Sequence, residues 1–130
     1  MSTETSKKTV VIDLDNTLAD YIGGWEANKN FPGKPRCDVV SGLKKLKENN
    51  WIIGILTTRP ICIVEQWLKQ YDLSEIIDFI NVNPYQPKDA SREKPIAHCY
   101  IDDRGIRYTG NNMVEIVAGL LAGGFQPWNK

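Results

Sequence analysis

The sequence lacks the features that would tie the chain to a membrane, to nucleic acid or to a disulfide framework. Its three cysteines are odd in number and widely spaced, which matches neither paired disulfides nor a zinc site. The 16 basic and 16 acidic residues give a formal net charge of zero, so charge alone does not favour binding to nucleic acid. No apolar stretch approaches the roughly 18 residues that a membrane-spanning helix needs.

The amino-terminal segment, residues 1–8, is polar and lacks the apolar middle of a signal peptide. We therefore expect a cytoplasmic protein with reduced thiols, whose first eight residues are disordered. Apolar residues make up 42% and charged residues 25% of the 130 positions, which is ordinary for a globular protein with one core. Residues 1–130 are thus expected to form a single domain.

Short apolar runs rich in Val and Ile alternate along the chain with segments of helical spacing, which is typical of an α/β domain with a parallel sheet. The expected strands are 9–14, 51–56, 79–82, 99–101 and a short 106–108. The expected helices are centred on 39–46, 61–68 and 113–120, with Asp38 capping the first and Gly123-Gly124 ending the last. Between 19 and 50 we expect only a loop and one helix, which leaves no room for a separate lid domain.

The most informative segment is the first apolar run, Val10-Val11-Ile12, because two carboxylates follow it. Asp13 and Asp15 are two positions apart, and residues at this spacing on a strand point to the same side. In parallel α/β sheets, ligands bind at the carboxyl ends of the strands. Carboxylates at the end of a buried strand are costly unless a cation or a reaction uses them. The segment therefore predicts chemistry that involves a metal ion and an anionic substrate.

Three later segments place polar residues in comparable positions. The run that ends at Leu56 is followed by Thr57-Thr58-Arg59, and the run that ends at Ile101 is followed by Asp102-Asp103. Lys94-Pro95 stands just before this last strand. The order is thus a strand with two aspartates, a strand with threonine, a lysine, and a strand with an aspartate pair.

These four elements, which span residues 10–103, resemble the four motifs of the haloacid dehalogenase superfamily of aspartyl-phosphate phosphotransferases. The stretch from Lys94 to Arg104 is also similar to a segment of small members of that superfamily that lack a cap domain. The resemblance implies a three-layer Rossmann-like domain with a central parallel sheet. It implies an open site, or a site covered by short loops or by a neighbouring subunit of a homo-oligomer.

The resemblance also assigns roles to the first motif. Asp13 matches the nucleophile, and Asp15 matches the general acid and base, whose backbone carbonyl also binds Mg²⁺ in the superfamily. Asn16 stands where glycine is often found. Two solvated carboxylates in a turn are the alternative interpretation of this pair.

In the second motif, Thr57 matches the residue that holds the transferring phosphoryl group, with Thr58 as the competing choice. Arg59 either contacts the substrate phosphate or pairs with an acid. Lys94 matches the third-motif lysine, which would neutralise the carboxylates and the phosphate, and Lys88 is its competitor. Thr, Arg and Lys side chains are also common in surface loops and at strand ends that have no functional role, which is the alternative interpretation of these five residues.

The fourth motif, Asp102-Asp103, implies a Mg²⁺ site shared with Asp13, because adjacent carboxylates repel each other unless a cation lies between them. Asp103 is expected to bind the ion directly and Asp102 to support the site without binding the ion. The sequence also allows the reverse assignment.

The sequence thus predicts a Mg²⁺-dependent phosphomonoesterase for a phosphorylated small molecule, a sugar phosphate or a nucleotide. Alternatives are a phosphatase for a nucleic-acid end or a phosphoprotein, and a non-catalytic protein that binds phosphate and Mg²⁺. A phosphoacceptor module of the response-regulator kind is disfavoured by the order of the motifs, since the lysine precedes the second acidic pair here.

Overall fold

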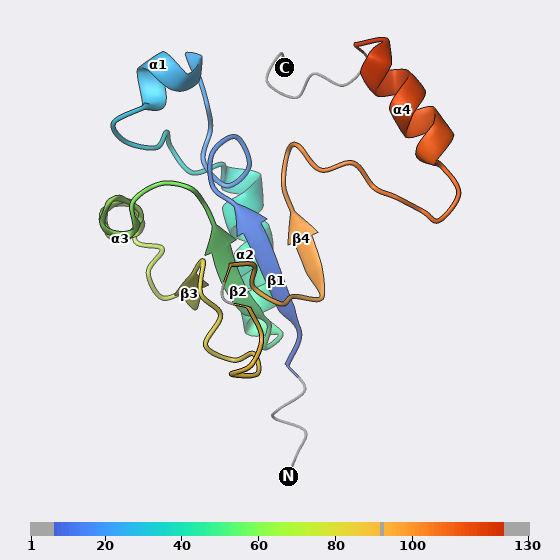
Figure 1. Cartoon of the computed structure of the whole chain (residues 1–130). Helices are drawn as coiled ribbons and strands as arrows, with labels where there is room; N and C mark the ends of the chain where they lie inside the picture. The colour runs from blue at the N-terminus through green and yellow to red at the C-terminus, as the bar shows by residue number, and fades with distance from the viewer. Residues whose placement is uncertain (1–6, 92, 124–130) are drawn as a thin grey trace.

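The computed structural model describes residues 7–91 and 93–123, in which strands and helices alternate (Figure 1). The strands are β1 (Thr9–Asp13), β2 (Ile52–Leu56), β3 (Phe79–Ile80) and β4 (Cys99–Ile101). The helices are α1 (Gly24–Asn28), α2 (Cys37–Glu48), α3 (Ile61–Gln70) and α4 (Met113–Leu121). The expected α/β class with a central parallel sheet is confirmed.

The four strands form one parallel sheet in the order β3-β2-β1-β4. The first strand is therefore central, and Val11 has Gly54 of β2 on one side and Tyr100 of β4 on the other. All strands point the same way, so their carboxyl ends meet at a single edge of the sheet. Asp13, Leu56 and Ile101 end their strands there, which brings the segments that follow them together.

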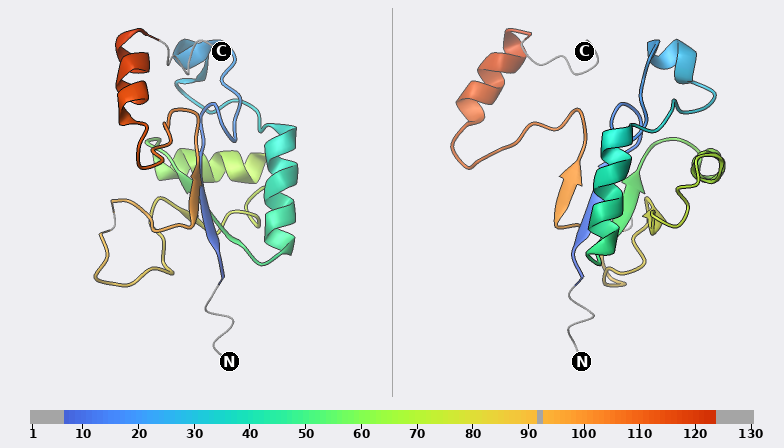
Figure 2. Two further views of the ribbon diagram at one scale, coloured as in Figure 1. Left: turned by 90° about the vertical axis from the view of Figure 1, so that its right-hand side faces the viewer. Right: turned by 180° about the vertical axis from the view of Figure 1, so that it is seen from behind.

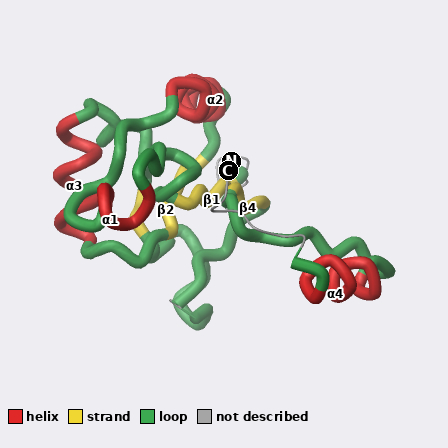
Figure 3. The backbone as a smooth tube through the Cα atoms, turned by 90° about the horizontal axis from the view of Figure 1, so that it is seen from above, coloured by secondary structure: helices red, strands yellow, loops and turns green. Residues whose placement is uncertain are grey.

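The hydrophobic core lies on one face of the sheet, under α2 and α3. β-Branched side chains suit a pleated strand, and those of β1 and β2 point alternately into this core. Figures 2 and 3 show α2 along one face of the sheet and α3 at its β2 end. The fully buried members of the core include Val10, Ile12, Ile53, Ile55, Val64 and Trp67.

The opposite face is crossed by the connection between β3 and β4, residues 81–98, which forms no helix in its described part. Pro95, within this connection, is fully buried, and the Tyr100 hydroxyl donates a hydrogen bond to the Pro95 carbonyl oxygen. Helix α4 stands beyond the β4 edge in Figures 1 and 3, and none of its residues is buried. No described helix is both long and apolar enough to cross a bilayer.

Several predicted elements differ from the structure. Asp38 does not cap α2: the helix begins at Cys37, with Arg36 in the cap position, and Asp38 lies in its first turn. An acidic residue there still stabilises the helix through its dipole. A short helix, α1, was not predicted between 19 and 50, because its five residues carry no apolar periodicity.

The predicted strand at 106–108 is wrong: these residues form part of the irregular connection from β4 to α4. A strand needs a partner, and no strand of the described sheet lies beyond β4 for them to pair with. The third strand ends at Ile80 rather than at Val82, and the second begins at Ile52. Residues 1–6 and Gly124 lie outside the described residues.

Candidate active site at the carboxyl edge of the sheet

Two carboxylates face each other at the carboxyl edge, one from the central strand and one from the edge strand. Asp13 is the last residue of β1, and Asp103 lies just after β4. Asp103 Oδ2 accepts a hydrogen bond from Asn16 Nδ2 at 3.0 Å. Asp103 Oδ1 is buried, and no donor in the described part of the chain reaches it. A buried carboxylate oxygen without a donor is costly, so a cation or a proton at this point would be stabilising.

The pKa of the Asp13 carboxyl group reflects the interaction between the two carboxylates. Burial, then hydrogen bonding and repulsion from the Asp103 carboxylate, raise the pKa of Asp13 from 3.8 to about 7. The backbone N–H of Leu14 acts in the opposite direction, and the Asp15 carboxylate adds a further small increase. Without a cation, Asp13 therefore holds its proton up to near neutral pH.

Asp15 is held by a buried arginine. Both Asp15 carboxylate oxygens accept hydrogen bonds from Arg59, from Nε and from Nη2, each at 2.8 Å. The Arg59 side chain is only 6% exposed, and it also donates to the carbonyl oxygen of Asn28 at the end of α1. The ring of Trp25 lies 5.7 Å from the guanidinium carbon. Arg59 thus joins Asp15 to the α1 segment, and in this structure it pairs with an acid.

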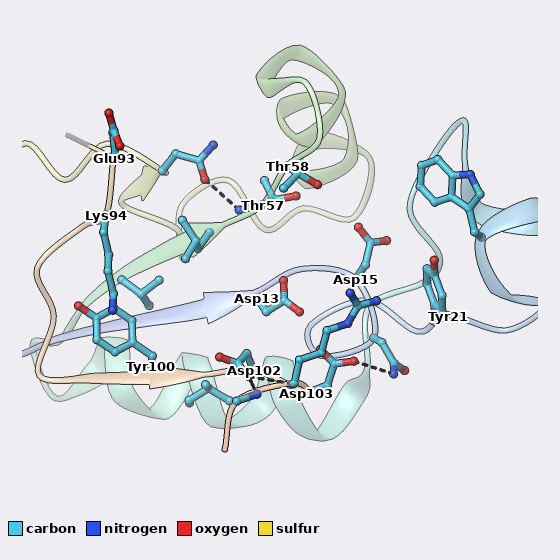
Figure 4. A pocket seen from close by; sticks show the side chains of 18 residues that line it. Asp13, Asp15, Tyr21, Thr57, Thr58, Glu93, Lys94, Tyr100, Asp102 and Asp103 are labelled. Carbon is cyan, nitrogen blue, oxygen red and sulfur yellow. Dashed lines mark hydrogen bonds between the residues drawn. The ribbon is translucent and has the colours of Figure 1, made fainter. Parts of the chain in front are cut away.

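Thr57 lies at the end of β2, beside the two aspartates of the first motif (Figure 4). Its backbone N–H donates to Asn81 Oδ1 at 2.9 Å, and its hydroxyl accepts a hydrogen bond from the backbone N–H of Arg59 at 3.1 Å. Asn81 adopts a left-handed backbone with φ 65°, a conformation that Asn tolerates better than most residues. The position of Thr57 is therefore fixed from both sides, whereas Thr58 is exposed.

Lys94 lines the same cavity from the connection before β4. Its ammonium lies 4.9 Å from the centre of the Tyr100 ring, a cation–π contact, and makes no ion pair with the described carboxylates. The competitor, Lys88, does not line the cavity. The geometry thus favours Lys94 of the two lysines, although in this conformation it lies away from the Asp13–Asp103 pair.

Asp102 belongs to the turn after β4. Its Oδ1 accepts hydrogen bonds from the backbone N–H groups of Arg104 and Gly105. This carboxylate is engaged with its own turn, and Asp103 is the member of the pair that faces Asp13.

The side chains surround a cavity of about 1010 Å³ that is open to solvent. Figure 4 shows Asp13, Asp15, Thr57 and Asp103 grouped at one end, with Glu93 and Lys94 at the other. All the predicted site residues except Arg59 line this cavity, and Arg59 lies behind Asp15. Tyr21, from the segment before α1, also faces it.

Sequence reasoning missed two residues that hold the site together, Asn81 and Arg36. Asn81 follows a short strand, where an isolated Asn is a frequent turn residue and attracts no notice. Arg36 donates to Asn16 from Nη1 and Nη2. Arg36 stands in the cap position of α2, where Ser, Thr, Asp or Asn is preferred. An arginine at this position could have indicated a role other than capping.

The carboxylates fit a hard divalent cation. No group of three or more His, Cys, Asp or Glu side chains in the described ranges is arranged to hold a metal ion. Mg²⁺, however, binds proteins through one or two carboxylates and keeps several waters and substrate oxygens as its other ligands. Asp13 and the unpartnered Oδ1 of Asp103 supply such a pair.

Comparisons with known proteins show the fold. No protein-family model and no curated protein matches the sequence. Among solved structures, the chain is similar to a conserved protein coded by a locus of Bacteroides thetaiotaomicron, with a TM-score of 0.59. The match covers 93% of this chain and 94% of that one, at 17% sequence identity. The two proteins therefore share a Rossmann-like α/β fold.

Proposed function

We propose that the protein is a Mg²⁺-dependent phosphomonoesterase that acts through an aspartyl-phosphate on Asp13. The observation that carries this proposal is the Asp13–Asp103 carboxylate pair with its buried, unpartnered oxygen. The pair lies at the carboxyl edge of a parallel sheet, where such folds bind ligands. The sequence resemblance to haloacid dehalogenases, described above, favours the same chemistry. The expected substrates are small phosphate esters, either sugar phosphates or nucleotides.

Asp13 and Asp103 would hold the ion, with the backbone carbonyl of Asp15 as a further oxygen ligand. When bound, Mg²⁺ would neutralise the two carboxylates and the phosphate charge. The proposal needs no third side-chain ligand, because Mg²⁺ retains water in most of its sites. Asp102 would support the turn that presents Asp103.

The residues divide the reaction into two displacements. An Asp13 carboxylate oxygen attacks phosphorus, the bond to the leaving oxygen breaks, and that oxygen takes a proton from Asp15. Water then attacks the phosphorus of the aspartyl-phosphate and gives its proton to Asp15, which releases inorganic phosphate and restores Asp13. To carry a proton, Asp15 gives up one of its two hydrogen bonds with Arg59.

The remaining polar groups would position the transferring phosphoryl group. The Thr57 hydroxyl and the nearby backbone N–H of Thr58 stand at the end of β2, beside Asp13. Lys94 would rotate from the Tyr100 ring towards the phosphate, since a bound anion attracts an ammonium more strongly than an aromatic face does.

The test is release of phosphate from a panel of esters with and without Mg²⁺. The panel holds an aryl phosphate, several sugar phosphates, nucleotides, a 3′-phosphorylated oligonucleotide and a phosphopeptide. Turnover that needs both Mg²⁺ and Asp13 supports the proposal, and the preferred ester identifies the substrate class. Tight binding of Mg²⁺ and phosphate without turnover of any ester would instead support a non-catalytic role.

The raised pKa of Asp13 predicts a pH-dependent effect of Mg²⁺ on stability. A carboxyl whose pKa is about 7 in the folded chain and 3.8 otherwise binds its proton more tightly when folded. The metal-free protein therefore loses stability as pH rises between these values. Mg²⁺ should offset this loss, so it should raise Tm more at about pH 8 than at about pH 5.

Thermal unfolding in Mg²⁺ and in chelator, for the wild type and Asp13→Asn, measures this effect. The variant has no carboxylate at this position and should lose most of the pH dependence of the Mg²⁺-induced shift. An equal shift at both pH values in the wild type would contradict the prediction.

A further inference from the structure

Asn16 connects the first motif to the fourth. It follows Asp15 in a left-handed backbone conformation with φ 63°, which Asn adopts more readily than most residues. Its side-chain amide nitrogen donates to Asp103 Oδ2 at 3.0 Å, across 87 positions of sequence. A glycine at this position would permit the same backbone turn but would leave Asp103 Oδ2 without this donor.

Arg36 determines which way the Asn16 amide faces. Its Nη1 donates to the Asn16 backbone carbonyl at 2.9 Å, and its Nη2 donates to Asn16 Oδ1 at 2.7 Å. A guanidinium only donates hydrogen bonds, so it holds the amide oxygen on its own side and turns the amide nitrogen towards Asp103. The backbone N–H of Arg36 donates to the Leu18 carbonyl at 2.8 Å, which fixes the base of this side chain.

The chain of contacts leaves one Asp103 oxygen for the ion. Asn16 occupies Oδ2, and Oδ1 is the buried oxygen without a donor, in a carboxylate that interacts with Asp13. Without the donor, the Asp103 carboxylate could rotate and offer either oxygen, or turn away from Asp13. Arg36 itself does not line the cavity and touches no group that reacts in the proposed mechanism.

We infer that Arg36 is a positioning residue for the cation site: through Asn16 it orients the Asp103 carboxylate towards Asp13. The inference rests on the proposed function, because it takes Asp13 and Asp103 as the residues that bind Mg²⁺. Arg36 orients Asp103 only through the Asn16 amide, so its effect on cation binding should vanish when that amide is removed, although its hydrogen bond to the backbone carbonyl of residue 16 remains. Residues that orient metal ligands typically change metal affinity about 10–100-fold when they are replaced.

The experiment measures Mg²⁺ binding by calorimetry, and Mn²⁺ binding by electron paramagnetic resonance, with no substrate present. Arg36→Lys keeps the charge but cannot donate two parallel hydrogen bonds, and should weaken binding about 10-fold or more. Asn16→Gly keeps the left-handed turn and should weaken binding by a similar factor. The double variant should bind no more weakly than Asn16→Gly alone. Arg107→Lys, at an exposed position on the way to α4, is the matched control and should bind as the wild type does.

The outcomes separate the inference from the proposed function. Wild-type protein that binds neither ion overturns both. Wild-type protein that binds, together with Arg36→Lys and Asn16→Gly that bind equally well, overturns the inference alone. Losses that add in the double variant overturn it too, since Arg36 would then act independently of Asn16. If Arg36→Lys does not fold, the folded Asn16→Gly variant still decides whether the amide orients Asp103.

Discussion

Asparagine in place of Asp13 is expected to lower the turnover of a phosphate ester by about 10³-fold or more, while the fold is kept. The amide has the shape of the carboxyl group but is a poor nucleophile. The substitution also removes the charge that Asp103 opposes, and the resulting relief should raise the Tm of the metal-free protein near neutral pH. Steady-state phosphate release and thermal unfolding measure the two effects.

Asp72→Asn is the matched control for this prediction. Asp72 is exposed after α3 and has a left-handed backbone with φ 59°, where asparagine is well tolerated. The same chemical change at this position should leave turnover and Tm unaltered. Phosphatase activity that persists in purified Asp13→Asn, at a level above that of a mock preparation, would refute the nucleophilic role of Asp13.

The largest expected effect on stability is the replacement of Arg59 by methionine. The change leaves both Asp15 oxygens and the Asn28 carbonyl without their donor, in surroundings where Arg59 itself is only 8% exposed. Removing one partner of a buried ion pair costs about 3–5 kcal/mol. The Asp15 side chain is 26% exposed and can regain some water, so a loss of about 2–4 kcal/mol in the free energy of unfolding is expected.

Urea unfolding of Arg59→Met and of the exposed control Arg107→Met measures this loss. A second variant tests its cause: Arg59→Met combined with Asp15→Leu removes both charges and should recover part of the stability. A single variant within about 0.5 kcal/mol of the wild type would show that the ion pair contributes little.

The strands that build the site could be predicted from the sequence because their apolar runs are long enough to stand out. β1 and β2 were found within one residue of their bounds, and the position of Asp13 at the end of β1 follows directly. The class of fold then follows from the alternation of strands and helices. Short elements such as α1, with five residues, carry too little periodicity to be recognised.

The contacts that hold the site could not be predicted in the same way. Arg59 pairs with Asp15 across 44 positions, and Arg36 meets Asn16 across 20. Neither partner is implied by periodicity or by local propensity, because such pairs form only when the elements have packed. The strand expected at 106–108 failed for a related reason: its apolar residues fitted a strand, but the sheet ends at β4.

The place of β1 in the centre of the sheet also determines when the site is completed during folding. β2 and the helices α2 and α3 follow β1 at moderate separations in the sequence. β4 pairs with β1 over a much longer separation, with Val10 opposite Cys99. Contacts of such long range close late, because the entropy of the intervening chain must first be lost. All residues of the core cluster precede Asp103 in the sequence, so the core can form before β4 joins the sheet. The repulsion between Asp13 and Asp103 therefore arises only after the core has formed, and recovery of Mg²⁺ binding during refolding should be slower than recovery of the helical signal.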